Sequence, residues 1–275
     1  MAGFVRTPEE VERIRERLTE NRFLDAERLS VRYHTRPEIV ERVLPPGLEP
    51  TDEPLVRVDV VEVGASNCVG SFAGGGLYVQ ARHGDLVGNY CLAMPMSTDR
   101  AITWGRELFG EPKKRASVDL TREGDEVDGR IERYGDPIIE LDATMEQERT
   151  VDPDPRTVFH YKHLPDIAGD GFQFDPTLVA VTFESDLRRF ETGEGSLSLA
   201  TTEHDPLGEI EVVEPLGAAY SVADIASSQR ALTTVDPEAF LPYAYGGGRV
   251  DDWLALDNEG RAGAGDGDDG NPTDE

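Results

Sequence analysis

The sequence predicts an α+β protein dominated by β-structure: a single domain built on a curved or barrel-like antiparallel sheet with a few short flanking helices. Three observations indicate this class. Short runs with period-two or β-branched patterns recur from about residue 55 onward. Gly, Asp and Pro separate these runs at short spacing, as in Arg122-Glu123-Gly124-Asp125. Strands and helices do not alternate in the regular series of a parallel α/β sheet, so a Rossmann fold is not expected.

Two helices are expected before the strands dominate. Thr7 and Glu10 have the spacing of a capping box and Pro8 stands at the first helical position, so a helix is predicted over residues 8–19. One face of this helix is marked by Val11, Ile14 and Leu18. A second start of the same type, Thr35-Arg36-Pro37-Glu38, predicts a short second helix.

Most of the chain after the second helix is expected to form strands. The runs are Leu55–Val63, Leu77–Arg82, Leu86–Met94, Ala116–Leu120, Glu126–Arg133, Ile138–Glu146, Thr157–Leu164, Thr177–Glu184, Ser196–Thr202 and Glu209–Val213. Arg106–Phe109 and Val222–Ser228 have the composition of short helices between strands. One folded domain is expected over residues 1–256, because no linker divides it. The tail, 257–275, is rich in Gly and Asp with almost nothing to bury and is predicted to be disordered.

The charge of the chain restricts its partners. It carries 55 acidic and 27 basic residues, a formal net charge of −28. Nucleic acid and anionic lipid would repel such a surface, so neither is an expected partner. Only three basic residues are lysines, and an acidic chain that retains arginine is typical of proteins adapted to high salt, where screening weakens repulsion between carboxylates. We therefore expect a halophile-type acidic protein that is soluble.

Signals for export, disulfides and metals are missing from the sequence. The first twenty residues lack an apolar signal-peptide core and no run of 18 apolar residues occurs, so a cytoplasmic protein without a membrane span is expected. Cys68 and Cys91 are expected to be buried free thiols. His160 and His163 fall on opposite faces of a predicted strand, which a shared metal would not tolerate, so no metal and no cofactor is expected. The run Gly74-Gly75-Gly76 predicts a flexible turn or a close approach of two backbones.

Two of the three lysines are neighbours, Lys113 and Lys114, in the run GRELFGEPKKR that begins at Gly105. Arginine stays protonated and cannot act as a nucleophile, whereas a lysine can when its ammonium form is destabilised. An adjacent positive charge has this effect, because like charges disfavour each other's charged state. The pair therefore indicates amine chemistry; the alternative is a solvated basic turn after Pro112.

Three blocks around this pair form a recognisable pattern: Glu53–Asp59 (EPLVRVD), Gly105–Leu108 (GREL) and Pro112–Lys114 (PKK). The pattern resembles the acetoacetate decarboxylase family, with little or no gap in the spacing between the blocks. Weaker similarity on both sides extends the resemblance over about residues 27–243. The GRE and PKK blocks are its specific part.

The resemblance implies a Schiff-base-forming lyase that acts on a small keto acid. Lys113 would attack a ketone carbonyl and form an iminium, and Lys114 would lower the pKa of Lys113. Acetoacetate decarboxylase is itself a standard example of a lysine activated in this way, so both roles are carried over from the family. Carbon dioxide would then leave a β-keto acid, and an enamine would remain to be protonated. The resemblance also implies homo-oligomers.

The chain differs from the family at three pocket positions. A family arginine corresponds to Ala26, unless Arg28 or Arg32 replaces it from another register. One family glutamate corresponds to Gly74, and a second corresponds to Asp59, which keeps the acidic group on a shorter side chain. The missing glutamate at Gly74 removes a carboxylate that would steer substrate or transfer protons, so decarboxylation of acetoacetate itself is less firmly implied than imine formation.

Other residues near the lysine pair are expected to support the site. An apolar wall that desolvates the amine is expected from Phe72, Met94 and Met96, the alternative being plain core. Glu107 with Arg106 is expected to form a structural ion pair, with orientation of the loop as the alternative. Glu111 would partly cancel the charge that perturbs Lys113 if it pointed inward, and we expect it to face solvent.

Three classes of function therefore stay open at the level of sequence. The first is decarboxylation of a β-keto acid through the Lys113 iminium. The second uses the same imine for an aldolase, dehydratase or hydratase reaction on an α-keto acid, which the departures at Ala26 and Gly74 favour. The third is a non-catalytic relative that binds a small carboxylate or ketone; the missing arginine and glutamate support it and the retained lysine pair opposes it. A purely structural or interaction protein has only the acidic tail in its favour.

Overall fold

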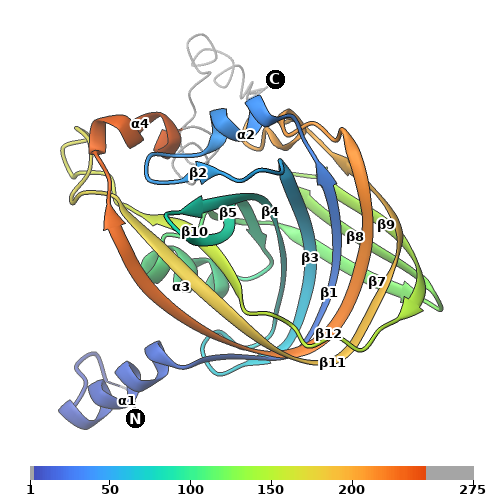
Figure 1. The fold of residues 1–275 in the computed structure, drawn as a ribbon. Helices are drawn as coiled ribbons and strands as arrows, with labels where there is room; N and C mark the ends of the chain where they lie inside the picture. Colours follow the sequence, from blue (N-terminus) through green and yellow to red (C-terminus); the bar gives the residue numbers. More distant parts are fainter. Residues whose placement is uncertain (1–2, 246–275) are drawn as a thin grey trace, which may run out of the picture.

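Seven strands close into a barrel in the computed structural model, which describes residues 3–245 (Figure 1). The strand order is β10-β5-β4-β3-β1-β12-β11, and the pairing of β10 with β11 closes the barrel. All neighbours are antiparallel except β10 and β5. The bounds are β1 Asn21–His34, β3 Leu55–Ser66, β4 Phe72–His83, β5 Leu86–Met96, β10 Arg156–Lys162, β11 Thr177–Leu199 and β12 Glu214–Thr234. The predicted fold class, a β-dominated domain with a curved antiparallel sheet, is confirmed.

Three further strands extend the sheet from β11 in the order β9-β8-β7 and lie beside the barrel wall. A Cβ atom placed on Gly129 of β8 would lie 2.9 Å from Val60 of β3, so glycine allows the two layers to pack closely. Two short strands pair at the other edges, β6 with β5 and β2 with β4. The bounds are β2 Glu49–Pro50, β6 Lys113–Arg115, β7 Ser117–Glu123, β8 Glu126–Arg133 and β9 Asp136–Glu148.

The alternation of side chains along β3 separates the two faces of the barrel wall. Val56, Val58 and Val60 are fully buried in the main core, which includes residues of β8 and β9. Burying each such aliphatic side chain contributes about 1.5–3 kcal/mol to stability. Asp59 and Val61, on the other face of the same strand, face the interior of the barrel. A single strand thus supplies both the hydrophobic core and a charged group of the interior.

Four α-helices and one 3-10 helix of the described residues lie around the sheet: α1 Pro8–Thr19, α2 Pro37–Val43, α3 Asp99–Phe109, η1 Leu207–Glu209 and α4 Pro237–Tyr245. The first helix and its capping box are confirmed: the Thr7 hydroxyl accepts from the Glu10 N–H, and the Glu10 carboxylate accepts from the Thr7 N–H. None of the residues of α1 is buried, and it extends away from the barrel (Figure 1). In α2 the predicted cap is wrong, because the N-cap residue is Arg36 and its side chain makes no cap hydrogen bond.

Two predictions for the second half of the chain are wrong. Val222–Ser228 is part of strand β12, because pairing with β1 and β11 overrides the helix propensity of its alanines and buries Ala223 and Ile225. Glu209–Val213 is not a strand, since η1 ends there and the chain continues as coil. The separate run Ser196–Thr202 mostly belongs to the long strand β11.

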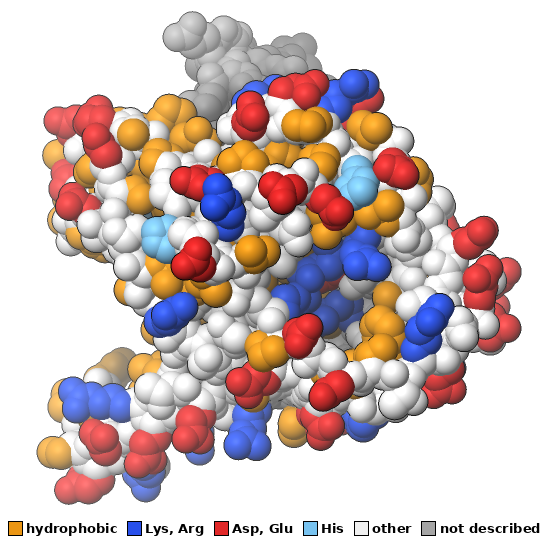
Figure 2. All heavy atoms as spheres, viewed as in Figure 1, with side chains coloured by type: hydrophobic (Ala, Val, Ile, Leu, Met, Phe, Trp, Pro, Cys, Tyr) orange, Lys and Arg blue, Asp and Glu red, His pale blue; other side chains and the backbone are white. Residues whose placement is uncertain are grey.

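Acidic side chains are scattered over the face shown in Figure 2, and Lys and Arg side chains gather in a hollow near its centre. In the described part of the chain, no helix is long and apolar enough to cross a membrane. The predicted disordered tail, 257–275, lies outside the described residues.

Candidate active site

A cavity of about 100 Å³ lies inside the barrel. All seven barrel strands contribute side chains to its wall, and the rest come from α3, β6 and the connecting residues Val69 and Glu111. Its apolar and aromatic lining includes Phe23, Val61, Phe72, Tyr78, Met94, Met96, Trp104, Phe109, Val181, Phe183 and Ile225. Its charged lining consists of Arg28, Asp59, Glu111, Lys113 and Arg156. A largely apolar enclosure with a few convergent charges is the usual form of a small-molecule site.

The turn after α3 brings Lys113 into this cavity. Gly110 ends the helix in the left-handed conformation (φ 74°), and the Glu111 N–H donates to the Gly105 carbonyl at 3.2 Å. The chain then enters β6, where Lys113 pairs with Met94 of β5 in a parallel register. The Lys113 residue is 7% exposed, so its amine stands in the barrel and not in bulk water.

Glu111 also faces the cavity, which corrects the expectation that it faces solvent. It is 5% exposed, and its Oε2 atom lies 2.7 Å from Lys113 Nζ. The reason is local: Gly110 and Pro112 border a different cavity, so Glu111 and Lys113 are directed to the barrel side of the same segment. Burial raises the pKa of the Glu111 carboxyl, but Lys113 outweighs burial, so that the pKa lies below its ordinary value.

The glycine of the GRE block has a steric role. A Cβ atom on Gly105 would overlap Glu111 Oε2 and would lie 2.6 Å from Lys113 Nζ. The ion pair therefore packs directly against the backbone of α3. Any side chain at this position would displace one of the two charged groups.

Asp59 stands opposite, within a cluster of guanidinium groups. Its Oδ1 accepts from the Ser30 hydroxyl at 2.7 Å and lies 3.1 Å from Arg57 Nε. Its Oδ2 accepts from Arg156 Nη1 at 3.3 Å and lies 3.9 Å from Arg28 Nε. Burial raises the pKa of Asp59, but the three arginines, Arg57 first, outweigh burial and hold the pKa below its ordinary value.

The interior has an excess of positive charge. Within residues 3–245, the three arginines and Lys113 face two carboxylates in the interior, those of Asp59 and Glu111. Burial and the neighbouring guanidiniums lower the pKa of Arg156 to about 9, so this side chain is still charged at neutral pH. Arg28 and Arg156 line the cavity directly, and a guanidinium binds carboxylates well. The arrangement therefore suits an anionic ligand.

The register of β1 resolves the question of the family arginine. Ala26 is buried in an apolar cluster with Val63 and Ile225. Arg28, two residues further along the same face of β1, lines the cavity, whereas Arg32 is exposed and does not. Of the two candidate substitutes, Arg28 is thus the one that the structure places beside Asp59.

Lys114 lies on the opposite face of β6 from Lys113, as alternation along a strand requires. It is buried, and its Nζ donates to the His204 carbonyl at 2.6 Å and lies 3.5 Å from Asp205 Oδ1. Arg133 Nε binds the other oxygen of Asp205 at 2.7 Å. The ammonium of Lys114 is therefore compensated outside the cavity, and Lys114 does not line it.

The other predicted site residues separate into two groups. Phe72, Met94 and Met96 line the cavity as expected, and Asp59 does too. Glu107 is exposed on α3 and does not line it.

The run Gly74–Gly76 lies within strand β4 and not in a turn. The close approach is confirmed, since a Cβ atom on Gly75 would overlap the Asp59 carbonyl. At Gly74, a Cβ atom would lie 2.6 Å from Met96. Met96 therefore occupies the space that a longer side chain at position 74 would need.

Arg57 and Arg156 are charged groups around Asp59 that the sequence analysis did not single out. Arg57 lies two residues before Asp59 in a strand, a spacing that puts both on one face and is a usable signal. Arg156 is 97 positions from Asp59, and nothing in the sequence links the two.

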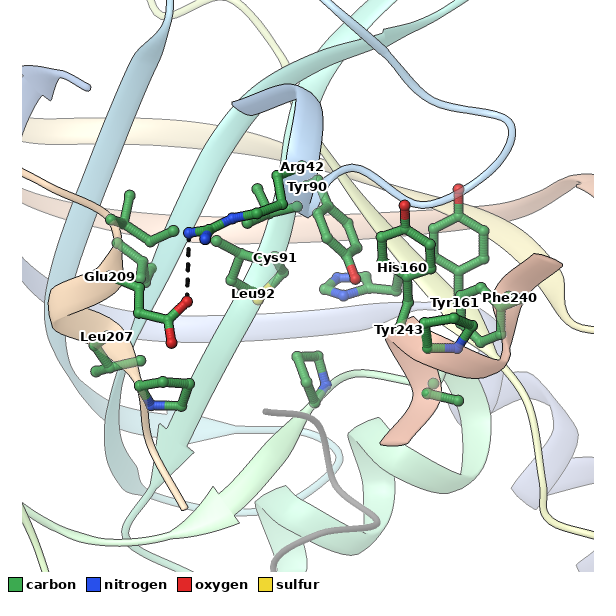
Figure 3. Close-up of a pocket in the computed structure, with 18 of the residues that line it drawn as sticks. Arg42, Tyr90, Cys91, Leu92, His160, Tyr161, Leu207, Glu209, Phe240 and Tyr243 are labelled. Atoms are coloured by element: carbon green, nitrogen blue, oxygen red, sulfur yellow. Dashed lines mark hydrogen bonds and ion pairs between the residues drawn. The ribbon is translucent and has the colours of Figure 1, made fainter. Parts of the chain in front are cut away.

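A second cavity, of about 390 Å³, is lined in part by Gly110 and Pro112, and Figure 3 shows it. His160 and Tyr90 line it, and on one side Arg42 of α2 faces Glu209 of η1, with 3.3 Å between Nη2 and Oε2. His160 is 1% exposed, and neither ring nitrogen has a hydrogen-bond partner among the described residues. Its Nε2 lies 3.9 Å from Glu111 Oε1, so Glu111 stands between the two cavities.

Comparison with known proteins matches the sequence of this chain to one family. The profile of the family described as acetoacetate decarboxylase (ADC) matches residues 7–235, most of the chain. The chain belongs to the acetoacetate decarboxylase family. Acetoacetate decarboxylases from Burkholderia cenocepacia and Burkholderia vietnamiensis are each 29% identical to it, over 211 and 215 residues, and the matches cover 74% of this chain and 84% of each relative.

Solved structures of other proteins share the fold of this chain. Acetoacetate decarboxylase from Legionella pneumophila superposes with a TM-score of 0.72 at 22% identity, covering 78% of this chain and 87% of that one. The enduracididine biosynthesis enzyme MppR in complex with pyruvate superposes with a TM-score of 0.66 at 16% identity, covering 85% of this chain and 93% of that one. The fold thus occurs in proteins that are named for different chemistries.

Proposed function

We propose that this protein is a Schiff-base-forming lyase that acts on a small keto acid, with decarboxylation of a β-keto acid as its reaction. One observation supports this most: the buried amine of Lys113 shares a largely apolar cavity with the guanidiniums of Arg28 and Arg156. A keto acid carries the two groups that such a cavity complements, a carbonyl for the amine and a carboxylate for the arginines.

The reaction follows from this placement. The uncharged amine of Lys113 attacks the ketone carbon, and loss of water leaves an iminium. The carboxylate of the substrate lies toward Arg28 and Arg156. When the bond between the carboxylate and the α-carbon breaks, carbon dioxide leaves and the electron pair moves to the iminium nitrogen, which gives a neutral enamine. Protonation of the enamine carbon and hydrolysis then release the ketone and restore the lysine.

Lys114 has a different part in this proposal from the one expected from the sequence. Its ammonium is compensated by Asp205 and the His204 carbonyl on the other face of β6. An electrostatic effect on Lys113 stays a prediction, and the geometry favours a role in holding β6 against the loop at 204–205.

A second use of the same imine is favoured by one observation. The position that matches a family glutamate is Gly74, and Met96 fills the adjacent space. The relative MppR, which has been solved with pyruvate and with a condensation product of pyruvate and an aldehyde, has the same fold. Aldol condensation and dehydration on an α-keto acid is therefore the second candidate, and it uses Lys113 in the same way.

Borohydride trapping across a panel of keto acids tests the proposal. Reduction of the iminium would fix the substrate on Lys113 as a stable secondary amine, detected as an added mass. Release of carbon dioxide from acetoacetate supports the first candidate. Trapping of pyruvate, with consumption of an added aldehyde and no carbon dioxide, supports the second. Absence of any adduct with every keto acid over pH 5–9 contradicts both and leaves a non-catalytic carboxylate binder.

A further inference from the structure

We propose that Glu111 is the acid–base catalyst of this site and moves protons to and from Lys113 Nζ and the carbonyl oxygen of the substrate. This inference rests on the proposed Schiff-base function. Its basis is the 2.7 Å contact between Glu111 Oε2 and Lys113 Nζ inside the barrel cavity. General acid–base catalysis requires this kind of distance between the catalytic group and the atom that gains or loses the proton.

The contact provides a way to form an uncharged amine in a buried site. A proton that moves from Nζ to Oε2 converts an ammonium–carboxylate pair into an amine and a carboxylic acid. Neither state carries a net charge, so the conversion does not leave an isolated charge in an apolar surrounding, which would be costly. His160, which lies on the far side of Glu111, is neutral near pH 7, because burial lowers its pKa to about 4. Among the described residues, Lys113 is therefore the cation in contact with this carboxylate, with 2.7 Å between Nζ and Oε2.

The proton transfers balance over the formation of the iminium. Glu111 takes one proton from the ammonium, and the amine then bonds to the carbonyl carbon while Glu111 returns that proton to the carbonyl oxygen. A second proton passes from the nitrogen through Glu111 to the hydroxyl, which leaves as water. The sum is ammonium plus ketone to iminium plus water, and Glu111 ends as the carboxylate beside the positive iminium. No other reactant is required.

The position of Glu111 also accounts for the glycine at position 74. A glutamate there would need the space of Met96, which lies 2.6 Å from where a Cβ would stand. Glu111 supplies a carboxylate from the opposite direction, through the turn at Gly110, and it reaches Nζ because Gly105 leaves room for the pair. The chain thus has a carboxylate at the amine, placed on a different element.

Glu111→Gln tests the proposal, because it keeps the size of the side chain and removes the proton acceptor. The rate of borohydride-trapped adduct formation on Lys113, with a keto acid that the wild type traps, should fall about 100-fold near pH 7. The rate for Glu111→Gln should also rise steeply with pH, since solvent base must now remove the ammonium proton, while the wild-type rate changes little between pH 6 and pH 8. In Glu111→Ala, added formate should restore part of the rate, in proportion to its concentration and beyond sodium chloride of equal ionic strength.

Glu146→Gln serves as the matched control, because Glu146 is an exposed glutamate of β9 and its loss changes the net charge equally. Trapping by Glu111→Gln as fast as, or faster than, the wild type with an unchanged pH profile overturns the role of Glu111. Failure of formate to increase the rate of folded Glu111→Ala argues against it as well. A wild type that traps no keto acid at all contradicts the Schiff-base function instead, so the two failures are distinguishable.

Discussion

The two adjacent lysines on β6 have opposite surroundings. Lys113 faces the barrel cavity and one carboxylate, that of Glu111, at 2.7 Å. Lys114 faces away from it and is held by a carbonyl oxygen and by Asp205, which Arg133 also binds. The amine of Lys113 is next to space for a ligand, whereas that of Lys114 is enclosed by protein groups. Two residues of one type and nearly equal burial are thus suited to different tasks.

The two lysines are adjacent in the sequence, but their ammonium groups are not adjacent in space. Consecutive side chains of a strand point to opposite faces, so β6 separates the two ammonium groups. The group that can change the charge of Lys113 most directly is the one in contact with it, Glu111. We therefore propose covalent chemistry for one face of β6 and anchoring for the other.

Replacing Lys113 with Ala is expected to have the largest effect. Without the amine no iminium can form, so turnover of the keto acid should fall at least about 1,000-fold. Carbon dioxide release and borohydride adducts are the measurements. Lys162→Ala, which removes the third lysine of the chain, is the control and should retain both signals. Turnover by Lys113→Ala within tenfold of the wild type would contradict the role of this face of β6.

Lys114→Ala should act mainly on stability. Removing one partner of a buried ion pair leaves Asp205 with incomplete compensation, at a cost of about 3 kcal/mol in the free energy of unfolding. Denaturant titration measures this loss. Trapping on Lys113 should persist in the folded variant, with its pH dependence shifted upward by less than about one unit. A larger upward shift without loss of stability would restore the electrostatic role that the sequence suggests.

Arg156→Met should weaken substrate binding, because Arg156 lines the cavity. Loss of a guanidinium near the carboxylate of the substrate should raise KM about 10- to 100-fold, with a smaller change in kcat. Steady-state kinetics on the trapped keto acid gives both constants. Arg130→Met, in which an exposed arginine of β8 is lost, is the control. An unchanged KM would exclude Arg156 from carboxylate recognition.

The decrease in the free energy of unfolding at low pH, here called the acid limb, tests whether the carboxylates in the cavity are ion-paired. Both Asp59 and Glu111 have a folded-state pKa below the ordinary carboxyl value, so their contribution is fully present above about pH 4 and is lost as pH falls through the lower folded values. The free energy of unfolding should therefore decrease from about pH 4 downward. Asp59→Asn should flatten that decrease, measured by denaturant titration at a series of pH values in high salt. An equally steep acid limb in Asp59→Asn would show that this carboxyl is not ion-paired in the cavity.

The sequence predicted the parts of the structure that depend on local rules. The capping box of α1, the runs that form β3 and β8, and the lysine pair after Pro112 are all readable from spacing and composition. The inward direction of Glu111 was predicted wrongly, because it depends on the left-handed turn at Gly110 and on the pairing of β6 with β5.

Long-range pairing explains the remaining gaps. Arg156 meets Asp59 only because β10 closes the barrel between β5 and β11, and no local pattern encodes that closure. Val222–Ser228 was predicted to be a helix for the same reason, since its partners β1 and β11 fix its strand conformation.

Mapping the borohydride adduct by peptide mass spectrometry tests the central claim most directly. Incubation with a keto acid and borohydride, followed by digestion, should place the added mass on Lys113 alone, with Lys114 and Lys162 unmodified in the same sample. An adduct on Lys114, or equal labelling of all three lysines, would show that the barrel cavity does not select the reacting amine.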